Sequence, residues 1–236
     1  MTIVLVHGNP ETEVIWDDLV PHLRSDDVVR LSPPGFGSAI PSDFDCSTDA
    51  YRNWLAGELG KLTQPIDLVG HDWGGGHVIR IAIERPDLIR SWASDILGCF
   101  DPDYVWHDMA RAWQTPDVGE QAVVQMLGLP AEARAQRYES LGMTSAIARR
   151  VAAAANKEMG RAILALYRSA AQPIMRDFGA GLPRAAAKPG LALIATEDFY
   201  CGGEALARRS AERAGAKIAI LRGRTLVDVS AAKTRR

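Results

Sequence analysis

The stretch Gly70-His71-Asp72-Trp73-Gly74-Gly75 (GHDWGG, 70–75) decides how this chain folds. It follows the apolar run IDLV (66–69) and precedes the helical pattern GGHVIRIAIERP (75–86). Such a strand, turn and helix expose the central side chain, and small neighbours let the strand and helix approach closely. The centre often carries Ser, but here it is Asp72. The amino terminus of the helix favours an ionised carboxylate, which can attack carbon and form an ester. We therefore predict Asp72 as a nucleophile, with a plain N-cap as the alternative.

Six short apolar runs alternate with helical patterns along the chain, and this alternation predicts an α/β fold. The runs are TIVLV (2–6), DVVRLS (27–32), IDLVG (66–70), SWASDIL (91–97), LALIAT (191–196) and AKIAIL (216–221). Helical patterns lie at about 12–24, 46–62, 73–85 and 203–214. We expect a parallel, doubly wound sheet of about six strands, with ligand-binding loops at its carboxyl ends.

Residues 104–186 interrupt this alternation. The segment is rich in Ala, Arg and Met, reads as several helices and contains no convincing strand. We predict a helical cap over residues 104–186, lying as a lid on the carboxyl edge of the sheet. Residues 1–103 and 187–236 would then form the α/β core.

Composition narrows the class of protein. The 236 residues are 47% hydrophobic and carry a net charge of −2, which favours a folded domain and disfavours a nucleic-acid partner. The three cysteines (Cys46, Cys99 and Cys201) match no metal spacing, and their odd number suggests a reducing cytoplasm. No run is long enough to span a membrane, and MTIVLVHGNP does not read as a signal peptide. We expect no metal or cofactor.

The motifs around Asp72 resemble the aspartate-nucleophile branch of the α/β-hydrolase superfamily, namely haloalkane dehalogenases and epoxide hydrolases. The resemblance extends from HGNP (7–10) to the strand near 221. It implies that HGNP is the oxyanion loop, and that Asn9 and Trp73 hold the departing halide with side-chain N–H groups.

Two segments of the predicted cap also resemble haloalkane dehalogenases and epoxide hydrolases. The segments AWQTPDVGE (112–120) and LYRSA (166–170) are similar to lid segments of both groups. Tyr167 could donate a proton to an epoxide, or could simply pack. A second lid tyrosine, usual in epoxide hydrolases, is missing near Ala112 or Trp113, which favours the dehalogenase reading. Trp106 and Trp113 suggest an aromatic-walled pocket for a small apolar substrate, although lid packing explains them equally well.

The resemblance also implies an acid and a base. Asp198 is our candidate for the acid because it follows the strand LALIAT, with Asp95 as a weaker candidate. The base should be a His after the last strand, but the five histidines are His7, His22, His71, His77 and His107. The resemblance makes His7 and His71 structural, which leaves His77 or His107 as substitute bases.

The end of the chain suggests why the base is missing. Arg224-Thr225-Leu226-Val227-Asp228 can be encoded as CGG ACA CTG GTG GAT. Read one base later, these codons and the next G give Gly-His-Trp-Trp-Met. We hypothesise that the chain left its ancestral frame near residues 222–224 and lost both the base and the terminal helix. Apolar surface near the last strand would then be exposed, or covered by self-association.

The sequence therefore predicts a hydrolase of the haloalkane dehalogenase type, impaired in turnover. Epoxide hydrolysis with the same nucleophile is one alternative. A ligand-binding α/β-hydrolase fold without catalysis is another.

Overall fold

The computed structural model describes residues 1–223 of the chain. One parallel sheet of six strands, in the order β2-β1-β3-β4-β5-β6, forms its centre. This confirms the predicted fold class and all six predicted strands. Their bounds are β1 Thr2–Val6, β2 Val28–Leu31, β3 Ile66–Gly70, β4 Ser91–Ser94, β5 Gly190–Ala195 and β6 Lys217–Leu221.

The strand order places the candidate site at a switch in direction. The chain passes from β1 outward to β2 and then returns to pair β3 on the other side of β1. Loops diverge at such a point and leave a crevice at the carboxyl ends of the strands. Val6 is paired with Gly70, and Gly70 with Ser94. The residues that follow β1, β3 and β4 therefore reach the same level of the sheet.

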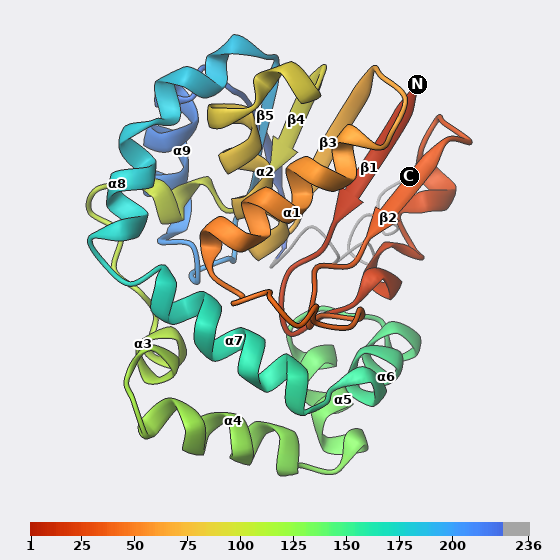
Figure 1. The fold of residues 1–236 in the computed structure, drawn as a ribbon, viewed down its shortest axis with the longest axis vertical. Helices are drawn as coiled ribbons and strands as arrows, with labels where there is room; N and C mark the ends of the chain where they lie inside the picture. Colours follow the sequence, from red (N-terminus) through yellow and green to blue (C-terminus); the bar gives the residue numbers. More distant parts are fainter. Residues whose placement is uncertain (224–236) are drawn as a thin grey trace.

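Helices of the core cover the sheet and connect its strands. The longest are α1 Thr48–Gly60, α2 Trp73–Glu84 and α9 Gly203–Arg213. Helix α1 crosses the strands at the front of Figure 1 and packs against α2, which lies on β1, β3 and β4. Helix α9 packs on β5 and β6. The central position of α2 explains why nearly all of its residues are buried.

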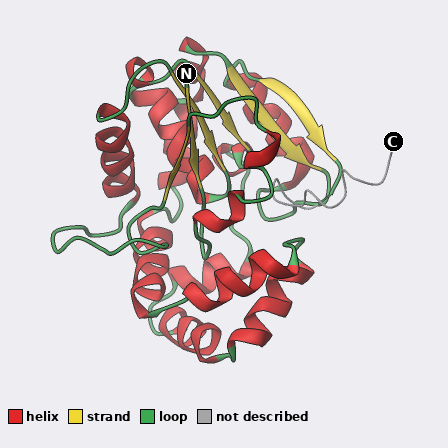
Figure 2. Cartoon of the chain, turned by 90° about the vertical axis from the view of Figure 1, so that its right-hand side faces the viewer, coloured by secondary structure: helices red, strands yellow, loops and turns green. Residues whose placement is uncertain are grey.

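The insertion forms a separate layer beyond the strand ends. Figures 1 and 2 show its helices grouped below the sheet. They are α3 Asp108–Gln114, α4 Val118–Gly128, α5 Ala131–Ser140, α6 Ser145–Ala154 and α7 Lys157–Ser169. The chain then returns through α8 Ile174–Ala180 and the 3₁₀ segment η5 Leu182–Ala187, which packs against α2. The helices α3–α7 therefore form the cap, while η5 belongs spatially to the core.

The cap is joined to the core through a second hydrophobic cluster. Trp16 and Ile15 of the core pack with Ile147, Ala148 and other buried residues of α5 and α6. Each fully buried large apolar side chain contributes about 1.5–3 kcal/mol relative to an exposed one. This contact joins cap helices α5 and α6 to β1 and to the loop that follows it.

The predicted helix at 12–24 is wrong. The structure has two short 3₁₀ segments there, η1 Glu13–Trp16 and η2 Val20–His22. Pro21 has no N–H group for an i to i−4 hydrogen bond, so a continuous α-helix cannot pass through it. The apolar residues of the pattern are nevertheless buried, since both Ile15 and Trp16 lie in the hydrophobic core.

Strand β6 lies at the edge of the sheet, and its Ile220 is 42% exposed. The expectation of exposed apolar surface near the last strand stays a prediction, because it also depends on residues outside the described range. The predictions for the tail itself, including the change of reading frame, concern residues 224–236 and lie outside the described residues.

Candidate active site

Asp72 lies on a strained turn between β3 and α2. Its backbone has φ 50° and ψ −131°, a conformation that L residues rarely adopt. The turn requires close backbone contacts. A Cβ atom on Gly74 would lie 2.1 Å from the carbonyl oxygen of Val6, and one on Gly70 would lie 2.5 Å from the carbonyl carbon of Gly74. The small residues of GHDWGG thus perform the packing role that the sequence predicts for them.

The loop after β1 faces this turn. The backbone N–H of Asn9 donates to Oδ1 of Asp72 over 3.0 Å. His7 contacts the loop with its ring: Nδ1 lies 2.8 Å from the carbonyl oxygen of Gly8, and Nε2 lies 3.3 Å from Oγ of Ser32. The side-chain amide of Asn9 is buried, and neither of its polar atoms has a hydrogen-bond partner among the described residues. An unpaired buried amide is costly, and its N–H groups are free to bind a ligand.

The electrostatics of Asp72 differ from the sequence-based expectation. Burial raises its pKa to about 7, and the negative charge of Glu11 adds to this rise. His71 and the backbone N–H groups of Asn9 and Trp73 lower the pKa, but by less. At neutral pH the carboxyl group is therefore only partly ionised. The expectation that the helix terminus keeps it ionised is wrong because desolvation outweighs the helix dipole.

Aromatic residues of the core and the cap meet above the turn. Trp73 stacks on Trp106 with ring centroids 6.0 Å apart, and Tyr167 packs edge-on against Trp73 at 5.4 Å. Trp113 lies 4.7 Å from Tyr167. All four are buried, and the indole nitrogens of Trp106 and Trp113 have no hydrogen-bond partner among the described residues. The structure thus brings the four predicted aromatic residues into one cluster.

The two candidate acids have different surroundings. Asp95, directly after β4, accepts the backbone N–H of Asp72 at 3.0 Å with Oδ1 and contacts Nδ1 of His71 at 2.5 Å with Oδ2. Asp198 follows β5 and accepts the backbone N–H of Tyr200 at 2.8 Å. Burial and the charge of Asp95 raise the pKa of Asp198. Asp95 is therefore the acid that contacts the turn directly.

The other histidines near the site have structural surroundings. His77 stacks on Tyr51 at 5.0 Å, and burial lowers its pKa to about 3. Burial also lowers the pKa of His7, to about 4. His107 caps α3, where Nδ1 accepts the backbone N–H of Ala110 at 3.2 Å. A ring nitrogen used in this way is not available to accept a proton from water.

Glu11 is a site residue that the sequence analysis missed. It is 6% exposed, its Oε1 lies 3.3 Å from Nε2 of His71, and its Oε2 accepts the backbone N–H of Gly8 at 3.3 Å. A glutamate in a loop is ordinarily a surface residue. Its position two residues after Asn9, in the loop that faces Asp72, was the available signal.

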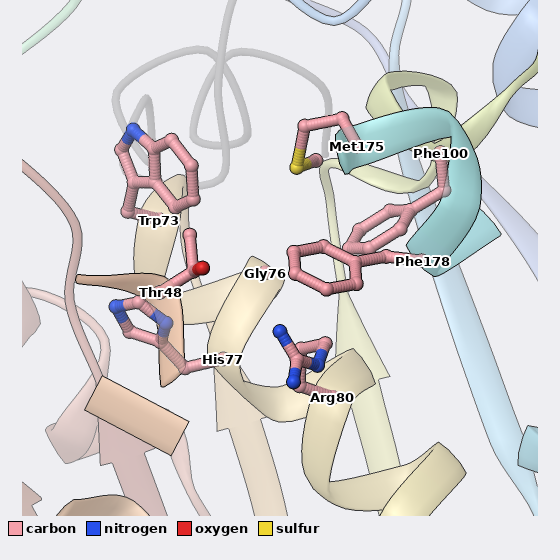
Figure 3. A pocket seen from close by; sticks show the side chains of 8 residues that line it. All are labelled: Thr48, Trp73, Gly76, His77, Arg80, Phe100, Met175 and Phe178. Atoms are coloured by element: carbon pink, nitrogen blue, oxygen red, sulfur yellow. The ribbon is translucent and has the colours of Figure 1, made fainter. Parts of the chain in front are cut away.

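A small cavity lies behind Trp73, between α2 and α8 (Figure 3). It is lined by Thr48, Trp73, Gly76, His77, Arg80, Phe100, Met175 and Phe178. It leaves room of about 10 Å³, roughly what one water molecule needs. The guanidinium of Arg80 lies over the ring of Phe178, 3.8 Å from its centroid, and closes one side of the cavity. This space is too small for an organic substrate.

Within residues 1–223, no group of three or more His, Cys, Asp or Glu side chains has the arrangement of a metal site. No helix in the same range is long and apolar enough to cross a membrane.

The sheet, the strained turn after β3 and the helical insertion together define an α/β-hydrolase fold. The sequence pattern of the alpha/beta hydrolase family matches residues 3–230, and the chain belongs to this family.

Two known relatives are similar in sequence to about half of this chain. The haloalkane dehalogenase of Mesorhizobium japonicum is 28% identical over 137 residues, which cover 52% of this chain and 43% of that protein. The probable oxidoreductase EphD of Mycobacterium tuberculosis is 32% identical over 138 residues, covering 54% of this chain and 23% of that protein. The match thus spans less than half of the length of either relative.

Solved structures share the fold over nearly the whole chain. A putative ancestral haloalkane dehalogenase, AncHLD2, has a TM-score of 0.72 at 22% identity and covers 98% of this chain and 87% of its own. The enol-lactonase of Burkholderia xenovorans LB400 has a TM-score of 0.69 at 20% identity, covering 98% and 86%. Similarity of this degree establishes the fold. The reaction depends instead on the side chains of the site.

Proposed function

We propose that Asp72 attacks a carbon that carries a halogen. The new bond joins a carboxylate oxygen to carbon, and the halide leaves with the electron pair of the carbon–halogen bond. The product is an alkyl ester of Asp72. The observation that carries this proposal is the position of Asp72, a half-buried carboxylate on the strained turn after β3. Its Oδ1 accepts the backbone N–H of Asn9, whose side-chain amide has no hydrogen-bond partner among the described residues.

Asn9 and Trp73 would stabilise the departing halide. A halide accepts hydrogen bonds, and both side chains can donate an N–H in a site from which water is largely excluded. The indole of Trp73 is held on three sides, by Trp106, Tyr167 and His77. A donor that is held in place before the reaction loses little energy in reorganising.

The substrate would be small and apolar. Trp106 and Tyr167 pack against the indole of Trp73, and Trp113 packs against Tyr167. These three rings come from the connection to the cap and from two cap helices. Aromatic rings bind an alkyl chain by excluding water. The similarity to the haloalkane dehalogenase of Mesorhizobium japonicum supports this class of substrate.

We further propose that hydrolysis of the ester is slow. Water attacks an ester efficiently only with a general base, which typically contributes about 10² to 10⁴ in rate. The five histidines of the chain are residues 7, 22, 71, 77 and 107. His7 and His77 have strongly lowered pKa values, and His107 uses Nδ1 as a helix cap. The alkyl enzyme should therefore accumulate.

The experiment uses a primary bromoalkane, such as 1-bromohexane, with the full chain. We expect about one equivalent of bromide per folded chain and an added hexyl group on Asp72 in the intact-protein mass. The matched control Asp72→Ala should release no bromide. Sustained turnover at ordinary enzymatic rates would contradict the impaired second step. Binding of the alkane without bromide release would contradict the alkylation.

Epoxide hydrolysis is the second candidate because Tyr167 lies close enough to Asp72 for the two to interact electrostatically. A phenol there could protonate the oxygen of an opening epoxide ring. Styrene oxide should then alkylate Asp72 in the parent chain and react much more slowly with Tyr167→Phe. The same variant should react normally with 1-bromohexane if halide displacement is the native chemistry.

A further inference from the structure

Three buried ionisable residues form a chain beneath Asp72. His71 lies between Asp95, 2.5 Å from Nδ1, and Glu11, 3.3 Å from Nε2. The three residues are 8% exposed or less. They come from the loop after β1, the end of β3 and the end of β4, which the register of the sheet brings to one level. We call this arrangement the His71 bridge.

The His71 bridge connects the two halves of the active site. On one side, Asp95 accepts the backbone N–H of Asp72. On the other side, Glu11 accepts the backbone N–H of Gly8, whose neighbour Asn9 donates to Oδ1 of Asp72. The contacts close into a ring that begins and ends at the nucleophile. A shift of any member would change the angle between the carboxylate and the oxyanion loop.

We propose that Glu11, His71 and Asp95 are positioning residues which hold Asp72 against the oxyanion loop and set the charge at the nucleophile. Neither acid needs to orient a base in this arrangement. The proposal deepens the proposed function and rests on Asp72 as the nucleophile.

The charges around the bridge have definite signs. Burial lowers the pKa of His71, but the charges of Asp95 and Glu11 together raise it well above its usual value. His71 is therefore an imidazolium that donates to both carboxylates. The described titratable groups that face the bridge and Asp72 come from five elements or loops: His7, Glu11, Asp95, Tyr138, Tyr167, Asp198 and Cys201.

The two ends of the bridge act on Asp72 in opposite directions. The negative charge of Glu11 raises the pKa of Asp72, and the positive charge of His71 lowers it. Removing the charge of Glu11 should therefore make Asp72 easier to ionise. Removing the charge of His71 should make it harder. A merely structural role would produce no such pair of opposite shifts.

The test measures the ionisation of Asp72 directly. Protein with ¹³C-labelled aspartate carboxyl groups is titrated by NMR, and the Asp72 signal is assigned by its absence in Asp72→Asn. We expect the titration midpoint to fall by about one pH unit in Glu11→Gln and to rise by a similar amount in His71→Gln. Glu58→Gln, which removes a surface partner of Lys61, is the matched control and should leave the midpoint unchanged.

Glu11→Gln keeps the test decisive even if His71→Gln fails to fold, because Gln retains an oxygen that can accept the N–H of Gly8. A folded Glu11→Gln protein whose midpoint is unchanged or higher would overturn the proposal. Bromide release is measured in parallel. If the midpoints move as expected without bromide release, the bridge stands and the proposed function fails. If bromide is released and the midpoints do not move, the bridge fails and the proposed function stands.

Discussion

A Cβ atom on Gly8 would lie 2.2 Å from Oδ1 of Asp72, far inside van der Waals contact. The loop after β1 therefore approaches the Asp72 carboxylate so closely that only a glycine fits. Because Oδ1 also accepts the N–H of Asn9, the carboxylate cannot turn away without losing this hydrogen bond. The close approach of Gly8 to Asp72 therefore excludes every other residue type at position 8.

The first prediction is that Gly8→Ala strongly lowers the rate of alkylation. The methyl group must displace either the loop or the carboxylate, and a misplacement of about 1 Å can cost on the order of 10² in rate. Bromide release in a single turnover measures the loss. Gly57→Ala is the control, since a Cβ there meets nothing within 4 Å and the residue lies inside α1. It should keep full reactivity and gain up to about 1 kcal/mol of stability. Equal reactivity of the two variants would contradict the steric argument.

The second prediction concerns the pH dependence of alkylation. Only the ionised carboxylate attacks carbon, and burial raises the pKa of Asp72 to about 7. The rate should therefore fall about tenfold for each pH unit below 6 and level off above pH 8. Single-turnover bromide release between pH 5 and 9 measures this profile. A midpoint near 4, the value of an exposed aspartate, would show that water solvates the carboxyl group.

The third prediction is that Asp72→Asn stabilises the fold. A carboxyl group whose pKa rises from 3.8 to about 7 on folding prefers its protonated form in the native state. Its ionisation therefore costs stability progressively as the pH rises from about 4 to about 7, by about 4 kcal/mol at most. The neutral variant should be more stable above pH 7 and equally stable below pH 4. Urea unfolding at pH 4 and pH 8 measures the difference, and an advantage confined to acid pH would refute the assignment.

The fourth prediction separates function from stability at two asparagines. The amide of Asn9 has no hydrogen-bond partner among the described residues, whereas Oδ1 of Asn156 accepts the N–H of Met159 at 2.9 Å and caps α7. Asn9→Ala should lower bromide release by about 10²-fold, the cost of one oxyanion donor, with little loss of stability. Asn156→Ala should cost about 1 kcal/mol and leave the chemistry intact. Thermal unfolding and bromide release are measured on both proteins. Normal bromide release by Asn9→Ala would exclude a halide-binding role.

Local patterns in the sequence predicted most of the fold. Short apolar runs identified all six strands, because helices cover a parallel sheet and its strands are therefore rich in apolar residues. The 3.6-residue pattern identified α1, α2 and α9. It failed at 12–24, where the apolar residues are buried but Pro21 prevents a continuous helix. Periodicity reports which side chains are buried and does not report whether the backbone hydrogen bonds can form.

The sequence by itself determined the tight turn at Asp72, because its glycines and its aspartate are adjacent in the chain and their steric requirements are local. It also identified Asn9 and Trp73 as candidates, through their spacing from the strand ends. Only the tertiary structure decided the environment of Asp72. Pairing of Val6 with Gly70 and of Gly70 with Ser94 brings Glu11, His71 and Asp95 together from three separate loops. Burial and neighbouring charges set a pKa, and both depend on residues that are distant in sequence.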